Sequence, residues 1–430
     1  MKYFNRNITK ILLEKLKQTN IIALTGARQV GKTTLCEDLF PKYTNLAHSY
    51  ISFDDPDERL RFQQNPIGIL DSLDTPIIIL DEIQKIPSLF EPLKYIVDKG
   101  TRVKTNKPKI FILTGSSQLL LIPKINETLA GRISLLNLWP LSLSEVFNNN
   151  NTPLLQKIWD NKEITKKDNE LVTIISPETM RSFIKIKEEH QKWGGYPSVW
   201  QKESIVDKIN WLKDYRRTYL ERDISDIGRV DDIDTFALSQ KLLCARTGQL
   251  FSISEIARDL GNAVNTVKRY INLLSISFQC VLLRPYYENV GKRFIKSPKI
   301  YFPDVGLNKI ISGEIEVTSD ASYETWVLSE LIKWKELQPI EPELYFYRTS
   351  AGMEIDFLIK GENQLLPIEV KSGHKVNYAD AHNLEAFITE QKKIVPFGLI
   401  VYAGNELVEI RKNIWAVPDW ILFGGIIPEI

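Results

Sequence analysis

A glycine-rich segment near the start of the chain constrains the fold more than any other feature. Residues 26–33 read G-A-R-Q-V-G-K-T, which fits G-x-x-x-x-G-K-[S/T] at every fixed position. The segment follows the apolar run 21–24 and precedes a predicted helix at 33–40. A strand, a glycine-rich turn and a helix in this order form a phosphate-binding loop, because backbone N–H groups and the helix N-terminus face the phosphates.

The loop predicts that ATP and Mg²⁺ bind here as cofactors. Lys32 is expected to reach the β- and γ-phosphates, and the hydroxyl of Thr33 to ligate Mg²⁺. The predicted nucleotide-binding residues of this segment are Gly26, Ala27, Arg28, Gln29, Val30, Gly31, Lys32, Thr33 and Thr34.

A second motif supplies the acidic half of an ATPase site. Residues 77–82 read I-I-I-L-D-E, an apolar strand that ends in two acids. Asp81 is expected to hold Mg²⁺ through water, and Glu82 to polarise the attacking water. An acid pair at a strand end is common, but its combination with the upstream loop indicates hydrolysis rather than nucleotide binding alone.

A third apolar strand, 109–114, ends in T-G-S-S-Q. Hydroxyls at its tip would lie between the two previous motifs, so Ser116 is a candidate sensor of the γ-phosphate. Capping of the following helix by Ser116 or Ser117 explains the same residues, and the two roles are compatible.

The spacing of apolar runs predicts an α/β fold for the first domain. Strands are predicted at 21–24, 50–53, 76–80 and 109–114, with helical stretches between them and a further helix at 8–19. Short, fully apolar strands that alternate with helices indicate a parallel sheet covered on both faces.

Together these motifs resemble a prokaryotic AAA-type ATPase family whose members carry a C-terminal domain of otherwise unknown function. The likeness extends to L-A-G-R at 129–132, W-P-L-S at 139–142, G-G-Y-P at 194–197 and Y-L-E-R-D-I at 219–224. The resemblance implies a P-loop core of the AAA type and makes Arg132 a candidate phosphate-sensing arginine, although a surface charge explains it equally well. It also implies a homo-oligomer, since ATPases of this class usually need a neighbour's arginine. Candidates for that arginine finger are Arg216, Arg217 and Arg222. The alternative is that these arginines lie on a solvated helix face.

Residues 254–274 read as a helix, a tight turn at Gly261 and a second helix. Ile256 and Ala257 are expected to pack on Val267 and Ile271, which is typical of a helix-turn-helix entering a DNA groove. The residues then expected to face DNA are Asn265, Thr266, Lys268 and Arg269.

Between residues 268 and 299 the only acid is Glu288, whereas the basic residues are Lys268, Arg269, Arg284, Lys292, Arg293, Lys296 and Lys299. Such a basic stretch favours DNA contact, and a lid or protein-docking module is the alternative.

The last part of the chain carries a D…E-x-K pattern. Two predicted strands, 354–359 and 366–371, are joined by a turn at 361–364, which would bring Asp356 to Glu369 and Lys371. The pattern resembles the PD-(D/E)XK nuclease superfamily, with Ile355-Asp356 in place of Pro-Asp and Glu324 matching its helical acid. The resemblance implies that Glu324, Asp356 and Glu369 ligate a second Mg²⁺ while Lys371 positions the water. Cleavage of DNA, binding without cleavage and a merely solvated face all remain open.

These motifs divide the chain into four predicted parts. They are an AAA-type P-loop core at 1–147, a helical lid or linker at 148–236, a winged helix-turn-helix at 237–312 and a nuclease-like α/β domain at 313–430. Residues 148–170 are rich in Asn, Lys and Asp and are predicted to be a surface loop or boundary.

Composition narrows the function classes. The chain has 430 residues, 55 Lys plus Arg against 54 Asp plus Glu, and three Cys without a C-x-x-C pair. Net charge of +1 requires that any nucleic acid binds a local patch. The isolated Cys exclude a disulfide scaffold and fit a reducing cytoplasm. No secretory signal or membrane-spanning run is present, so we expect a cytoplasmic protein without a membrane partner.

The sequence therefore leaves two functional hypotheses. In the first, an ATPase couples ATP turnover to DNA binding or processing through the helix-turn-helix and the nuclease-like domain. In the second, a nucleotide-dependent switch acts on protein partners, with a catalytically silent nuclease-like domain.

Overall fold

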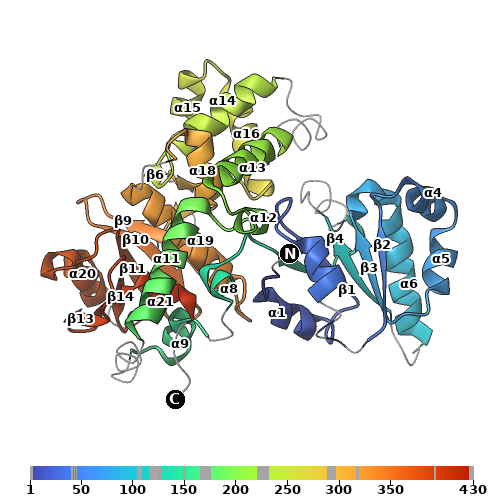
Figure 1. Ribbon diagram of the computed structural model, residues 1–430, viewed down its shortest axis with the longest axis horizontal. Coiled ribbons are helices and arrows are strands. Elements are labelled where there is room, and N and C mark those ends of the chain that lie inside the picture. Colours follow the sequence, from blue (N-terminus) through green and yellow to red (C-terminus); the bar gives the residue numbers. More distant parts are fainter. Residues whose placement is uncertain are drawn as a thin grey trace. The chain divides into compact units, whose positions relative to one another are not determined.

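The computed structural model describes residues 3–39, 42, 44, 46–103, 109–115, 125, 127–148, 152–164, 176–219, 232–287, 297–315, 319–391 and 394–425 (Figure 1). The chain divides into two compact units. The N-terminal unit comprises residues 5–140 and 276–278, and the C-terminal unit comprises residues 1–4, 141–275 and 279–430.

The N-terminal unit contains a five-stranded parallel sheet with the order β2-β3-β4-β1-β5. Its strands are β1 (Ile21–Thr25), β2 (His48–Ser52), β3 (Ile77–Asp81), β4 (Ile110–Thr114) and β5 (Ile133–Asn137). The four predicted strands are confirmed, and β5 is an additional edge strand. Because β4 lies between β1 and β3, the tip of the third strand lies between the other two motifs, as the sequence predicted.

Helices and short helical turns connect these strands. They are α1 (Ile8–Lys15), α2 (Lys32–Thr34), η1 (Leu35–Leu39), α4 (Pro56–Gln64), α5 (Pro66–Ser72), η2 (Ile83–Lys85), η3 (Pro87–Leu89) and α6 (Phe90–Val103). The helix predicted at 33–40 is therefore one α-helical turn followed by a π-helical turn.

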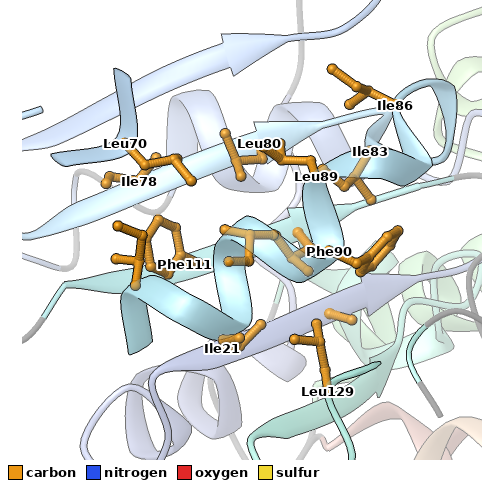
Figure 2. Packing of buried hydrophobic residues seen from close by; sticks show 14 of the residues in the cluster. Ile21, Leu70, Ile78, Leu80, Ile83, Ile86, Leu89, Phe90, Phe111 and Leu129 are labelled. Atoms are coloured by element: carbon orange, nitrogen blue, oxygen red, sulfur yellow. The ribbon is translucent and has the colours of Figure 1, made fainter. Parts of the chain in front are cut away.

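Apolar side chains from the sheet and its helices form one buried core (Figure 2). Ile21, Ile78 and Phe111 come from three strands and pack with Phe90 of α6 and Leu70 of α5. Every residue of β1 and β3 is buried, since helices cover both faces of a parallel sheet. This core fixes the strand ends that carry the motifs.

The C-terminal unit combines the strands of a mixed sheet with helices. These are α8 (Leu143–Phe147), α9 (Leu154–Asn161), α11 (Pro177–Trp193), α12 (Pro197–Trp200), α13 (Ile205–Thr218), α14 (Ile233–Cys244), α15 (Ile253–Asp259), α16 (Val264–Ile276), α18 (Val305–Ser312), α19 (Asp320–Lys335), η5 (Tyr378–Ala381), α20 (His382–Glu390) and α21 (Asp419–Gly424). The helical character predicted for the segment 148–236 is found in its described residues.

The segment 148–170 was predicted to be a surface loop or a boundary, and over residues 154–161 the structure has helix α9 instead of a loop. Leu154, Leu155 and Ile158 are buried on one face of this helix, and the Trp334 indole Nε1 of α19 donates a hydrogen bond to Gln156 at 2.9 Å. The polar composition of the segment concealed an amphipathic helix.

The mixed sheet of this unit has nine strands in the order β13-β14-β12-β11-β10-β9-β7-β8-β6. Its strands are β6 (Gln249–Leu250), β7 (Val281–Pro285), β8 (Lys299–Tyr301), β9 (Glu343–Arg348), β10 (Glu354–Lys360), β11 (Leu365–Lys371), β12 (Gly398–Tyr402), β13 (Val408–Arg411) and β14 (Ile414–Pro418). The predicted antiparallel pairing of β10 with β11 is confirmed. Strand β7 pairs in parallel with β9, so the regions predicted as a winged helix and a nuclease-like domain share one continuous sheet.

Helix α19 fixes the backbone where the chain enters the C-terminal unit. The carbonyl of Leu141 accepts hydrogen bonds from Lys333 Nζ at 3.0 Å and from His190 Nε2 at 2.9 Å. His190 Nδ1 accepts from the indole of Trp326, and burial lowers the pKa of His190 to about 3. His190 is thus a neutral structural residue that joins α11 to α19.

No helix within the described residues is both long enough and apolar enough to cross a bilayer.

Candidate functional site

The phosphate-binding loop has the backbone conformation that its glycines permit. Gly26 and Gly31 have φ of +151° and +95°, and Gln29 has φ of +59°. A Cβ atom on Gly26 would lie 2.2 Å from the carbonyl oxygen of Leu138. Since no side chain fits there, only glycine allows the chain after β5 to approach the loop so closely.

Lys32 turns back over this loop. Its side chain is almost fully buried, and its Nζ donates to the carbonyls of Gly26 at 3.0 Å and Ala27 at 2.8 Å. The ammonium is thereby held at the centre of the loop, where phosphate oxygens would compete for the same three protons.

Asp81, the last residue of β3, is contacted by side chains from α2, β2 and β4. Its Oδ2 accepts hydrogen bonds from Thr33 Oγ1 at 3.1 Å and from the Tyr50 hydroxyl at 2.6 Å, and its Oδ1 accepts from Thr114 Oγ1. The carboxylate is 4% exposed. The structure thus brings together Thr33 and Asp81 as the sequence predicted, and adds Tyr50 of β2.

Glu82 follows Asp81 with a left-handed backbone, φ +54°. Its carboxylate accepts a hydrogen bond from the Gln84 side-chain amide. Burial raises the pKa of Glu82, and the nearby Asp81 and Asp54 add to the increase while Lys32 opposes it. A raised pKa makes this carboxylate a stronger base than an exposed glutamate.

Two supporting residues were missed by sequence reasoning. Arg6, buried before α1, donates from Nη1 to the Val30 carbonyl at 2.7 Å and from Nη2 to the Trp139 carbonyl at 2.6 Å. It ties the loop to the segment after β5. Tyr50 was visible only as one residue of an apolar strand, and nothing in its neighbourhood indicated its contact with Asp81.

The donor set fits Mg²⁺. The hydroxyl of Thr33 and the carboxylate of Asp81 are hard oxygen ligands in contact with each other, and Mg²⁺ is commonly held by one or two such groups together with substrate phosphates. Of the other predicted contacts, Ser116 lies outside the described residues.

Arg132 is not brought to the phosphate loop of its own chain. It precedes β5, whose first residue pairs with Ile21 at the beginning of β1, so it lies at the opposite edge of the sheet from Gly26. Its guanidinium instead contacts Asp98, with Nε–Oδ1 and Nη2–Oδ2 distances of 2.7 and 3.1 Å. Strand direction therefore keeps Arg132 away from the phosphate-binding loop of its own chain.

The three candidates for the arginine finger differ in their surroundings. Arg216 is half-buried and donates to Gln240 Oε1 at 3.1 Å and to the Ala237 carbonyl, so it joins α13 to α14. Arg217 is exposed on α13, and Arg222 lies outside the described residues.

The predicted helix-turn-helix region contains the expected pair of helices, α15 and α16, with Gly261 in the left-handed conformation between them. Val267 and Ile271 are buried, as are Ile256 and Ala257. Of the residues predicted to contact DNA, Asn265 and Lys268 are exposed, and Thr266 and Arg269 are half-buried. The guanidinium of Arg269 lies 5.9 Å from the ring centre of Tyr270.

Asp356 and Glu369 face each other across β10 and β11, because Phe357 pairs with Ile368 in the next antiparallel register position. Asp356 Oδ2 accepts a hydrogen bond from the Val370 N–H at 2.8 Å. Lys371 Nζ lies 4.0 Å from Glu369 Oε2. Burial raises the pKa of Glu369 to about 9, and the adjacent Asp356 carboxylate contributes further.

Glu324 of α19 lies near these residues. Burial raises the pKa of Glu324, and the charge of the Asp356 carboxylate raises it further. Its Oε1, however, accepts hydrogen bonds from Lys299 Nζ at 3.2 Å and from Tyr301. Within the part of the chain that the structure describes, no group of three or more His, Cys, Asp or Glu side chains is arranged to hold a metal ion. The predicted ligands Glu324, Asp356 and Glu369 therefore lie near one another without forming the predicted metal centre.

The raised pKa of Glu369 predicts a stability that falls as pH rises. Above about pH 4.5, the ordinary value, the unfolded chain loses the proton, whereas the folded chain keeps it up to about pH 9. Wild type therefore loses at most about 1.4 kcal/mol per pH unit in this window. We expect Glu369→Gln to melt higher than wild type, with a difference that grows from about pH 5 to about pH 8 in thermal unfolding. The exposed Glu390→Gln is the matched control, and a constant difference across pH would contradict the assignment.

Comparisons with known protein families match three segments of the chain. Residues 18–147 match the family described as AAA domain, and residues 185–315 and 319–422 match two families described as domains of unknown function. An uncharacterised protein of Mycobacterium tuberculosis is 27% identical over 435 residues, covering 99% of this chain and 86% of the relative. One of Methanocaldococcus jannaschii is 24% identical over 387 residues, covering 85% and 77%.

Among solved structures, a Walker-type ATPase of Pyrococcus abyssi aligns with 72% of this chain and 96% of its own, at 13% identity and a TM-score of 0.44. Residues 18–147, which carry the phosphate-binding loop, are thus similar to an AAA domain, and the two later segments are each similar to a domain of unknown function.

Proposed function

We propose that this chain binds Mg·ATP at the loop 26–33 and hydrolyses it with Glu82. The observation that carries the proposal is the convergence of Thr33 and Thr114 on the buried carboxylate of Asp81. The ends of β3 and β4 and the short helix α2, which are far apart in the sequence, meet there at the edge where the loop lies, which is where ligands bind in open α/β sheets.

Each residue then has a defined role. Lys32 exchanges the carbonyls of Gly26 and Ala27 for phosphate oxygens when nucleotide binds. Thr33 and Asp81 hold Mg²⁺, which supplies charge stabilisation to the phosphates. Glu82, with its raised pKa, orients the attacking water and accepts its proton.

The chemistry also needs a cation at the γ-phosphate, and we propose that self-association provides it. In P-loop enzymes such an arginine can come from a neighbouring subunit. Arg132 lies at the far edge of its own sheet, partly exposed and oriented by Asp98. This position excludes it from its own site but suits an arginine presented to the next subunit.

We further propose that ATP turnover is coupled to DNA binding by α15 and α16. The exposed Asn265 and Lys268 at the start of α16 support a recognition helix, because base contacts are made from the N-terminal part of such a helix. The wider basic patch is weaker than the sequence predicted, since Lys299 is 4% exposed and points inward.

A charge reversal at α16 tests the coupling. Lys268→Glu is expected to weaken duplex DNA binding about uniformly across sequences and to reduce the salt slope by about one, and to remove any stimulation of ATP hydrolysis by duplex, forked or single-stranded DNA. Lys241→Glu on α14 makes the same charge change at another exposed site and should retain both. Fluorescence anisotropy and phosphate-release assays measure the two effects. Absence of salt-sensitive DNA binding by wild type would refute the coupling.

The second candidate function is a nucleotide-dependent switch for protein partners. The inward position of Lys299 favours it, because the C-terminal carboxylates then already have a cation of their own. In this case Lys32→Ala abolishes the cellular role, whereas Asp356→Ala and Lys371→Ala preserve it.

A further inference from the structure

Lys299, the first residue of β8, is buried among carboxylates. Its side chain is 5% exposed, and its Nζ lies 2.8 Å from Glu354 Oε1 and 3.2 Å from Glu324 Oε1. The stem passes over the ring of Phe346, with Nζ 5.5 Å from the ring centre. The ammonium is therefore fixed by two ion pairs and one aromatic face.

The carboxylates around this ammonium include two of the three that the nuclease resemblance assigns to a metal, Glu324 and Asp356. Glu324 is bound directly, and the charge of Asp356 favours the protonated form of Lys299 along with Glu324 and Glu354, so the pKa of Lys299 is raised in spite of its burial. Oε1 of Glu324 already accepts hydrogen bonds from Lys299 and Tyr301. A divalent ion that bound this oxygen would have to displace both donors.

Two cations cannot share this space. An ammonium and a divalent ion a few ångströms apart repel strongly in a buried site, and expelling Lys299 alone would leave it buried without a partner, which is strongly destabilising. Arg348 Nη1 lies 3.6 Å from Glu354 Oε2, so Glu354 has a further cation nearby. The residues present thus do not fit a resident divalent metal.

We infer that Lys299 is the resident cation of the C-terminal carboxylate cluster and excludes divalent metal from it. The cluster is defined by Glu324, Glu354 and Asp356. Its role is then structural, because it joins β8 to α19 and β10, and it does not catalyse phosphodiester cleavage. Lys299 falls in the segment 185–315 and its partners in the segment 319–422, so this ion-pair cluster connects the two domains of unknown function.

Manganese binding to the full chain without nucleotide tests this inference. All variants carry Asp81→Asn, which removes the metal ligand of the nucleotide site. With Lys299 present we expect no saturable Mn²⁺ site, whereas Lys299→Met, which retains the length but not the charge, creates one. Adding Asp356→Asn abolishes the new site, and Lys375→Met, at an exposed lysine of the segment 319–422, creates none. Isothermal titration and Mn²⁺ electron paramagnetic resonance report the binding.

Thermal unfolding gives a second readout. Removing Lys299 leaves buried like charges, so Lys299→Met is expected to melt lower than wild type, and Mn²⁺ to raise its melting temperature but not that of wild type. Asp356-dependent Mn²⁺ binding by the chain that retains Lys299 would overturn the inference. So would a folded Lys299→Met chain without any Mn²⁺ site. Lys299→Gln replaces Lys299→Met if the latter does not fold.

Discussion

Glu82→Gln is expected to reduce the rate of ATP hydrolysis by about 10²- to 10⁴-fold while ATP binding is retained. Loss of a general base typically has this magnitude, and glutamine preserves the shape of the side chain beside Gln84. Since burial raises the pKa of Glu82, the wild-type rate should fall on the acid side at a pH above the usual glutamate range. Single-turnover hydrolysis and fluorescent-nucleotide binding separate the two effects.

Two matched variants bracket this result. Lys32→Ala should lose nucleotide binding together with hydrolysis, because it removes the ammonium at the centre of the loop. Glu91→Gln, at an exposed glutamate of the same unit, should keep both. An unchanged turnover in Glu82→Gln would remove Glu82 from the mechanism and leave only nucleotide binding for this unit.

The parts of the site that the sequence predicted are local or follow strand ends. Lys32 and Thr33 belong to one short motif, and Asp81 ends an apolar strand, so parallel pairing alone brings them to one edge. Tyr50 and Arg6 could not be predicted in the same way. Their partners are set by strand order and by the packing of the segment after β5, which are tertiary features.

These differences have a common physical origin, because neither composition nor a sequence motif shows in which direction a side chain points. Lys299 was counted in a basic surface stretch, but it faces the inner side of β8. Arg132 was assigned to the phosphates from a motif, yet strand β5 begins at the wrong edge for its own loop. In the segment 148–170, the spacing of Leu154, Leu155 and Ile158 outweighs the polar residues around them.

The largest stability effect in the C-terminal unit is expected at Asp419. This residue is fully buried, and its Oδ2 contacts Lys187 Nζ at 3.5 Å, the Tyr323 hydroxyl at 2.9 Å and Gln191 Nε2 at 3.1 Å. Burial raises the pKa of Asp419, and Lys187 opposes the increase. Asp419→Ala leaves Lys187 buried without its counter-ion, so the free energy of unfolding should fall by about 3–5 kcal/mol in urea titrations followed by tryptophan fluorescence.

The double variant Lys187→Met/Asp419→Leu distinguishes the unpaired charge from lost packing. Replacing both ions with apolar side chains removes the desolvation penalty, so the double variant should be about as stable as wild type. Glu385→Ala, which breaks the exposed pair with Arg411, should cost less than about 1 kcal/mol. If Asp419→Ala were no worse than Glu385→Ala, the buried pair would not hold α11, α19 and α21 together.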